Sequence, residues 1–229
     1  MIKLVCYNIM IYFDYGGVGV TILEQISEKL QKGRGRELEA LIKQALEEGV
    51  GAEEILNGGL IFGMSIVGEK FKSGELYLPE VMMAARAMDG GVKILKPALT
   101  AVGVEPIGRA VICTVKGDKH DIGKNLVKMM IEGAGISCED LGVDVPAEKI
   151  VEAVKRTNAK IVCLSSLLTT TMPEMKNVIS ALEEAGIRKD VKVMVGGAPL
   201  SQKFADEIGA DSYTPDAASC AEAAKGFFI

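Results

Sequence analysis

The sequence predicts an α/β protein, with an N-terminal helical bundle followed by a five-stranded parallel sheet. Two observations support this prediction. From Ile22 to about Ala101, apolar residues recur at the spacing of amphipathic helices. After a stretch at residues 102–108 that contains glycine and proline, short apolar runs alternate five times with helical patterns, as they do in doubly wound sheets.

The first part of the chain predicts an extension and then the bundle. Residues 1–20 differ in character from the helical patterns after them and are interpreted as an N-terminal extension. Thr21, with Glu24 three residues later, is typical of a helix N-cap. Four helical patterns with short glycine-containing connections lie within residues 21–105, which indicates a small helical bundle.

Residues 106–229 predict a second domain, because the stretch before them has the composition of a linker. The five apolar runs predict strands at residues 109–115, 137–141, 160–164, 191–195 and 211–213. In the flavodoxin-like strand order 2-1-3-4-5, the carboxyl ends of strands one, three and four are neighbours at the switch point, where open α/β sheets bind ligands. We therefore expect site residues at these three strand ends.

Composition and charge argue against several classes of protein. The net charge is −5 and the pI is about 5.2, so no basic surface is expected for nucleic-acid binding. The five cysteines are an odd number and none forms a C-x-x-C pair, which indicates a reducing, cytoplasmic compartment rather than a disulfide framework or a zinc ribbon. The apolar residues 2–13 are too short to span a membrane and lack a signal-peptide cleavage site.

The only histidine of the chain, His120, lies directly after the first predicted strand, in the segment G-D-K-H-D-I-G that ends at Gly123. A neutral imidazole at that end of a parallel strand faces the ligand crevice and can ligate a transition metal. A loop histidine considered alone is more often a surface or helix-capping residue. The assignment of His120 therefore depends on the other strand ends.

Those ends carry residues that suit a ligand. A hydroxyl-rich stretch at residues 165–171 follows strand three, and Gly196-Gly197 follows strand four. Together they offer hydrogen bonds and close approach to the backbone, although each alone is typical of an ordinary turn between strand and helix. Neither a Walker A motif nor a Rossmann G-x-G-x-x-G is present, because Lys124 is followed by Asn125 and the glycine spacing differs.

The spacing of the three motifs is more specific than any one of them. Forty-one residues separate Gly123, which closes D-x-H-x-x-G, from Ser165, which opens S-x-L, and twenty-eight residues separate S-x-L from Gly196. This pattern resembles the cobalamin-binding signature of methionine synthase, methylmalonyl-CoA mutase and the corrinoid proteins of anaerobic methyltransferase systems. Residues 74–81 and 84–88 resemble the helical cap of the methyl-transferring branch, which the mutases lack.

The resemblance implies a Rossmann-like cobalamin-binding domain over residues 106–229 and a cap over residues 21–105. His120 would be the lower axial ligand of cobalt, and Asp118 would accept a hydrogen bond from the other ring nitrogen. Thr171 would extend this relay, which can take up or release a proton, in a position that serine holds in methionine synthase.

The remaining cofactor-binding residues are implied by the same resemblance. Tyr77 and Met82 would lie beside the upper face of the cofactor, although the residues alone favour ordinary bundle core. The loop and the strand ends would bind the lower face and the nucleotide tail through Gly117, Lys119, Asp121, Ile122, Gly123, Val143, Ser165, Leu167, Thr169, Gly196, Gly197, Tyr213 and Thr214.

By the same resemblance the chain is expected to carry a methyl group between a substrate-specific methyltransferase and a second methyltransferase, whose acceptor is tetrahydrofolate or a thiol. A reductive activator protein is a further expected partner. The chain is too short to include a methyltransferase barrel of about 250 residues, so it is not expected to catalyse transfer alone. The residues around Gly103 to Gly108 would serve as the hinge on which the cap moves.

Two alternatives stay open. A cobalamin-dependent sensor joins a similar cap to the same module, but sensors of this kind carry an additional DNA-binding domain, for which residues 1–20 are too short. A receiver-like or flavin-binding domain has the same topology, but a receiver requires a phosphorylatable aspartate at a strand end where this chain has Ser165. The sequence does not choose among methanol, methylamines, glycine betaine and methoxylated aromatics as methyl donors.

Overall fold

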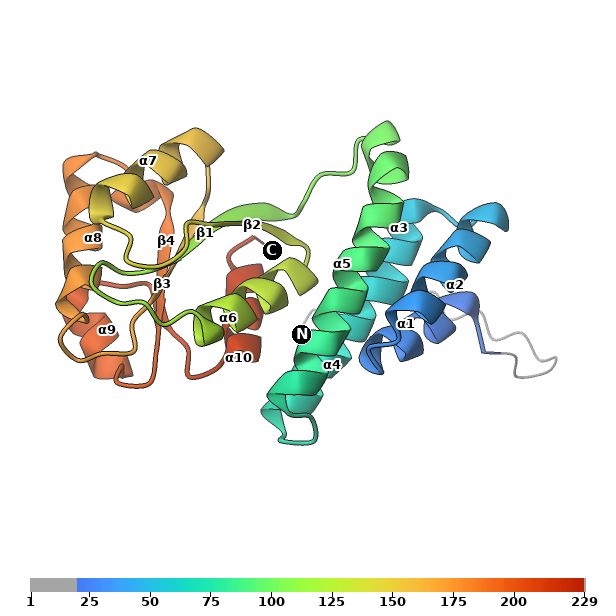
Figure 1. The fold of residues 1–229 in the computed structure, drawn as a ribbon. Coiled ribbons are helices and arrows are strands. Elements are labelled where there is room, and N and C mark those ends of the chain that lie inside the picture. The colour runs from blue at the N-terminus through green and yellow to red at the C-terminus, as the bar shows by residue number, and fades with distance from the viewer. Residues whose placement is uncertain (1–19, 229) are drawn as a thin grey trace, which may run out of the picture.

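The computed structural model describes residues 20–228, so the extension expected over residues 1–20 lies almost wholly outside the described residues. The described chain begins with helices packed side by side, on the right of Figure 1. They are α1 (Ile22–Gln31), α2 (Gly35–Glu47), α3 (Ala52–Glu54), α4 (Phe62–Lys72) and α5 (Leu78–Ala101). Residues Ile55–Ile61 between α3 and α4 are π-helical, so the third expected helix is one run with a widened middle.

The expected N-cap of α1 is confirmed. The Thr21 hydroxyl accepts a hydrogen bond from the backbone N–H of Glu24 at 3.2 Å, and the Glu24 carboxylate accepts one from the backbone N–H of Thr21 at 2.7 Å. The bundle core is formed by apolar side chains that recur every three or four residues and are fully buried, among them Ile26, Leu30, Leu38, Ile42, Leu60 and Val81.

The chain passes from the bundle to the sheet through residues 102–107, which form neither helix nor strand. The strands are β1 (Gly108–Thr114), β2 (Ile136–Asp140), β3 (Ile161–Ser165), β4 (Lys192–Gly196) and β5 (Ser212–Tyr213). All pairs are parallel and the order is β2-β1-β3-β4-β5, which confirms the predicted topology.

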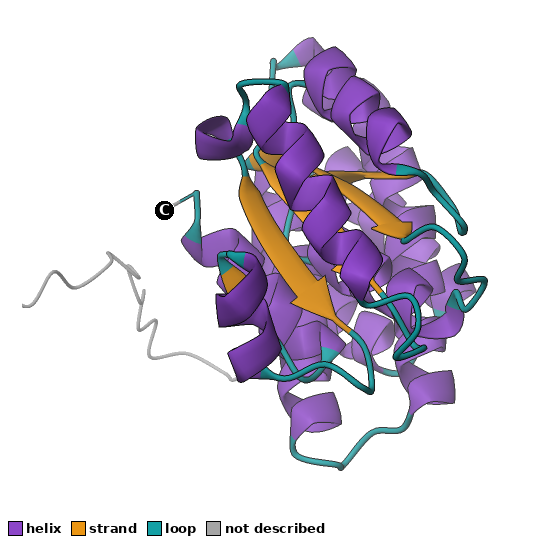
Figure 2. Cartoon of the chain, turned by 90° about the vertical axis from the view of Figure 1, so that its left-hand side faces the viewer, coloured by secondary structure: helices purple, strands orange, loops and turns teal. Residues whose placement is uncertain are grey.

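Helices cover both faces of the sheet, because alternate strand residues are apolar on both sides (Figure 2). One face packs against α6 (Ile122–Gly133) and α10 (Ala217–Gly226), and the other against α7 (Ala147–Thr157), α8 (Pro173–Glu184) and α9 (Gln202–Ile208). A short 3₁₀ turn, Arg188–Asp190, precedes β4.

The bundle packs on the α6 and α10 layer through α4 and α5, so that one apolar core continues from the bundle to that face of the sheet (Figure 1). An ion pair between Lys72 of α4 and Glu222 of α10, 3.1 Å apart, crosses this junction. Within residues 20–228, no helix combines the length and the apolar character needed to span a bilayer.

Candidate functional site

The expected strand ends lie side by side. In the register of the sheet, Thr114 of β1 lies opposite Ser165 of β3, and Ser165 lies opposite Gly196 of β4. Because these three strands end at the same level, the loops that follow them share one edge of the sheet. The loop after β1 carries His120 and is fastened to its own strand, since the buried Thr114 hydroxyl donates to the carbonyl of His120 at 2.7 Å.

His120 is bonded to Asp118 in the way the sequence predicts. Nδ1 of the imidazole lies 2.7 Å from Oδ1 of Asp118, and the same oxygen accepts the backbone N–H of His120 at 3.0 Å. A carboxylate only accepts hydrogen bonds, so Nδ1 carries a proton, and in the neutral ring Nε2 keeps its lone pair. The Asp118 side chain is fully buried, whereas the His120 side chain is 52% exposed. Nε2 of the imidazole is therefore directed away from Asp118, on a half-exposed ring whose loop is held by hydrogen bonds.

The second oxygen of Asp118 ties this loop to the loop after β3. Oδ2 accepts the backbone N–H of Leu167 at 2.7 Å and the hydroxyl of Thr171 at 3.1 Å. Burial by itself would raise the pKa of Asp118, but the hydrogen bonds to its two oxygens outweigh burial and hold that pKa well below the usual value. Asp118 is therefore a buried anion that is compensated by donors rather than by a cation.

The Thr171 hydroxyl lies beside Asp118, as the predicted relay requires, and a second hydroxyl, that of Ser166, adjoins it. The Thr171 side chain is almost fully buried, and its Oγ1 lies 2.8 Å from Oγ of Ser166 and 3.0 Å from the carbonyl oxygen of Leu168. Ser166 is fully buried and was not among the predicted residues. It belongs to the hydroxyl-rich stretch, but strand alternation does not show which hydroxyls turn inward once β3 has ended.

The other predicted residues of the lower face occupy the same edge. Ser165, Gly196, Tyr213 and Thr214 are half-buried at strand ends, and the N–H of Thr214 donates to Val195 at 3.4 Å. Gly197 has a φ of +141°, and a Cβ on it would lie 1.8 Å from the carbonyl oxygen of Ser166. Large side chains on this edge are exposed and apolar, namely Ile122 (69%), Leu167 (43%), Leu168 (40%) and Val143 (37%).

The remaining loop positions are exposed, and so is the cap tyrosine. Gly117 is exposed, and so are Lys119, Asp121, Gly123 and Thr169. The φ of Gly117 is +81°, and its backbone N–H donates to the carboxylate of Asp144. Tyr77 begins α5 as its N-cap and is 71% exposed, so the bundle-core interpretation of this residue is wrong. Met82 is half-buried on α5.

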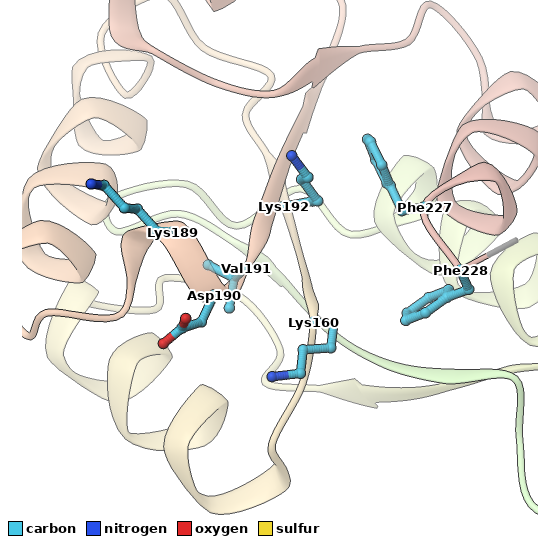
Figure 3. Close-up of a pocket in the computed structure, with 7 residues that line it drawn as sticks. All are labelled: Lys160, Lys189, Asp190, Val191, Lys192, Phe227 and Phe228. Atoms are coloured by element: carbon cyan, nitrogen blue, oxygen red, sulfur yellow. The ribbon is translucent and has the colours of Figure 1, made fainter.

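Two cavities lie elsewhere in the described chain. One, of about 220 Å³, lies at the amino ends of β3 and β4, beyond the opposite edge of the sheet. Figure 3 shows that its lysine ammonium groups, on Lys160, Lys189 and Lys192, point in different directions and do not converge on one ligand. The other, of about 170 Å³, lies among α4, α6 and α10. Neither cavity is lined by a predicted site residue.

Comparisons with known proteins agree on one kind of module. Residues 108–223 match a family model described as the B12 binding domain, and residues 22–96 match a second model with the same description. Dimethylamine corrinoid protein 3 of Methanosarcina acetivorans is 47% identical over 84% of this chain and 89% of its own length. The trimethylamine corrinoid protein of Methanosarcina barkeri is 44% identical over 76% of this chain and 82% of its own length.

Solved structures show the same architecture. The methanol:cobalamin methyltransferase complex of Methanosarcina barkeri matches with a TM-score of 0.83 and 29% identity, over 90% of this chain and 79% of that one. A cobalamin-binding protein from Desulfitobacterium hafniense matches with a TM-score of 0.76 and 31% identity, over 90% of this chain and 98% of that one.

Proposed function

Because this chain belongs to the family of cobalamin-binding corrinoid proteins, we propose that His120 ligates the cobalt of its cofactor while the chain carries a methyl group between partner methyltransferases. Both B12 binding models are matched, one by the bundle and one by the sheet domain. The cofactor of this family is cobalamin, and the relatives named above are corrinoid proteins of methylamine systems.

One observation supports His120 as the ligand more than any other. Its Nδ1 is engaged by the buried Asp118, while within residues 20–228 its Nε2 accepts no hydrogen bond and the ring is half exposed. This arrangement fixes the tautomer and the ring orientation of a metal-ligating histidine. His120 would thus contribute one protein nitrogen to the cobalt of a bound corrinoid.

The surroundings of His120 also fit a large, flat cofactor. The exposed Ile122 begins α6, and the exposed Val143 and Leu167 lie in the loops after β2 and β3; all three offer apolar surface to a macrocycle at the same sheet edge. At Gly196 the nearest atom to an added Cβ would be the Thr214 carbonyl oxygen, 3.7 Å away, so the end of β4 leaves room for a substituent of the cofactor. Tyr77, exposed at the start of α5, is free to shield the other face when the cap closes, with residues 103–108 as the hinge.

Each side chain of the relay has a defined task. A bound cobalamin would supply the nucleophilic cobalt chemistry of methyl transfer. Asp118 holds the proton on Nδ1 and thereby makes Nε2 a stronger donor. Thr171 donates to Asp118 and joins the loops after β1 and β3, so that the imidazole keeps one direction.

We infer that the methyl donor is a methylamine. Over the aligned regions, the relatives named for dimethylamine and trimethylamine are 47% and 44% identical to this chain, against 29% for the methanol complex. The partners would then be a methylamine-specific methyltransferase, a second methyltransferase and a reductive activator protein. The buried thiols Cys113, Cys163 and Cys220, which form no disulfide within the described chain, support a cytoplasmic location.

Reconstitution tests the proposal. Purified protein incubated with hydroxocobalamin and desalted should retain a visible corrinoid spectrum, and its cobalt(II) form should show nitrogen hyperfine splitting from the imidazole. His120→Ala should retain cofactor but lose that splitting. A protein without a corrinoid spectrum would refute cofactor binding, and unchanged splitting in His120→Ala would refute His120 as the ligand.

The donor is tested separately. The reduced, reconstituted protein is mixed with dimethylamine or methanol and the corresponding methyltransferase. We expect the methylated spectrum to appear with the amine system only. Methylation by the methanol system alone would refute a methylamine donor, and methylation by neither would favour the sensor interpretation.

A further inference from the structure

A short segment between β2 and α7, which we call the brace (residues 140–145), holds the loop that carries His120. Asp144 makes two contacts with that loop. Its Oδ1 accepts the backbone N–H of Gly117 at 2.6 Å, and its own N–H donates to the carbonyl of Asp118 at 2.9 Å. Gly117 and Asp118, three and two residues before His120, are thus both bonded to one residue of another strand connection.

Asp144 makes both contacts from an uncommon backbone conformation. Its φ is +55°. Apart from the glycines, only Asp144 and Asn158 have a positive φ within the described chain. Aspartate and asparagine tolerate this region better than other side chains. In this conformation the N–H and the carboxylate of Asp144 both contact the loop that carries His120.

The brace is itself fixed on its other side. Its Gly142 carbonyl accepts the backbone N–H of Thr114, 3.0 Å away, and the N–H of Val145 donates to the carbonyl of Thr114 at 3.1 Å. Asp140 accepts the N–H of Gly142 on one oxygen, and on the other it accepts the ammonium of Lys124 at 2.6 Å.

The buried ion pair between Lys124 and Asp140 makes it energetically costly to detach the brace from α6. Its side chain is only 2% exposed, and its ammonium is satisfied by Asp140 and Asn125, both at 2.6 Å. A buried ammonium that lost its carboxylate partner would be strongly destabilised, so the ion pair holds the end of β2 against α6. Since α6 begins directly after the His120 loop, the brace and the loop are anchored to the same helix.

We propose that Asp144 is a positioning residue, which keeps the imidazole of His120 directed at the cobalt by bonding Gly117 and Asp118 from the anchored brace. The inference rests on the proposed ligation by His120. The imidazole itself has one hydrogen-bonded contact, to Asp118, so its direction depends on how rigidly the loop holds Asp118 and its neighbours.

Three substitutions separate positioning from stability. Asp144→Gly removes the carboxylate and relieves the positive φ, whereas Asp144→Asn keeps both an acceptor oxygen and a side chain that suits this φ. Asn158→Gly is the matched control, because Asn158 has nearly the same φ, +53°, at the C-cap of α7. It therefore reports what glycine costs the fold without touching the loop.

Two measurements are made on each protein. In the cobalt(II) form, we expect the ratio of imidazole-ligated to unligated cobalt to fall about tenfold in Asp144→Gly, consistent with one lost hydrogen bond to a charged group. Asp144→Asn keeps an acceptor but not the charge, so its ratio should fall less than that of Asp144→Gly, and Asn158→Gly should keep the wild-type ratio. In the cofactor-free protein, hydrogen exchange at the amides of Asp118 and His120 should become faster in Asp144→Gly only.

The outcomes distinguish the two proposals. If wild-type protein binds hydroxocobalamin but shows no nitrogen splitting, the ligation by His120 is refuted. If wild-type protein shows the splitting while Asp144→Gly keeps both its ratio and its amide exchange, the positioning role of Asp144 is refuted and the ligation stands. An equal fall of the ratio in Asn158→Gly would also refute positioning, because glycine alone would then explain the loss.

Discussion

The turn after β4 contains the position where a single methyl group should be least tolerated. A Cβ on Gly197 would lie 1.8 Å from the carbonyl oxygen and 2.8 Å from the carbonyl carbon of Ser166, and both belong to backbone that a rotamer change cannot move. Ser166 is also bonded to β4, since its N–H donates to the carbonyl of Gly196 at 3.2 Å. Gly197→Ala should therefore force the ends of β3 and β4 apart.

The cost has two parts. Alanine at a φ of +141° is strained by about 1–3 kcal/mol, and overpacking against the Ser166 backbone adds about 1–3 kcal/mol. We expect the free energy of unfolding to fall by about 4 kcal/mol. For a chain of this size, about 2–4 °C of melting temperature corresponds to each kcal/mol, so the midpoint should fall by about 8–16 °C.

Thermal unfolding of the cofactor-free protein, followed by circular dichroism, measures this effect. Gly186→Ala is the matched control, because Gly186 has a φ of +73° but a Cβ there meets no atom within 4 Å. The control should lose only the conformational strain, about 1 kcal/mol. Equal midpoints for Gly197→Ala and Gly186→Ala would show that the contact with Ser166 is relieved without cost, and the reasoning would fail.

Three further predictions concern Asp118, its partners and the buried thiol of Cys113. Asp118→Asn should lower the free energy of unfolding by about 2–3 kcal/mol in chemical denaturation near neutral pH, because an amide group would then face donors. Asp118 has a lowered pKa in the folded protein, so its stabilisation is complete above the unfolded pKa of about 4 and is lost as the pH falls through the folded value. Wild-type stability should consequently fall more steeply than that of Asp118→Asn below pH 4, and parallel curves would contradict this. Thr171→Val should cost about 1 kcal/mol in the same assay and Thr171→Ser much less, whereas equal losses would exclude the hydroxyl as the cause. Burial raises the pKa of Cys113 to about 12, so peptide mapping should find it unlabelled by iodoacetamide in folded protein at pH 8, and rapid labelling would refute its burial.

Local pattern was sufficient for the strands, whereas the strand order was taken from the flavodoxin-like fold, with which the structure agrees. The strands were predicted within one or two residues, because continuous apolar runs bounded by turn residues define buried parallel strands. The π-helical residues Ile55–Ile61 were not predicted, since an amphipathic spacing of three and four residues does not reveal one widened turn.

The sequence by itself indicated the family and the cofactor, because the resemblance depends on residue types at fixed spacing along the chain, and that resemblance implied the contact between His120 and Asp118. Only the tertiary structure showed that the Ser166 hydroxyl lies next to that of Thr171 and that Asp144 is hydrogen-bonded to the loop that carries His120. It also left Tyr77 exposed. The physical reason is that hydrogen bonds between separate strand connections depend on the sheet register and on backbone angles such as the positive φ of Asp144. Periodicity and motif spacing carry information on neither.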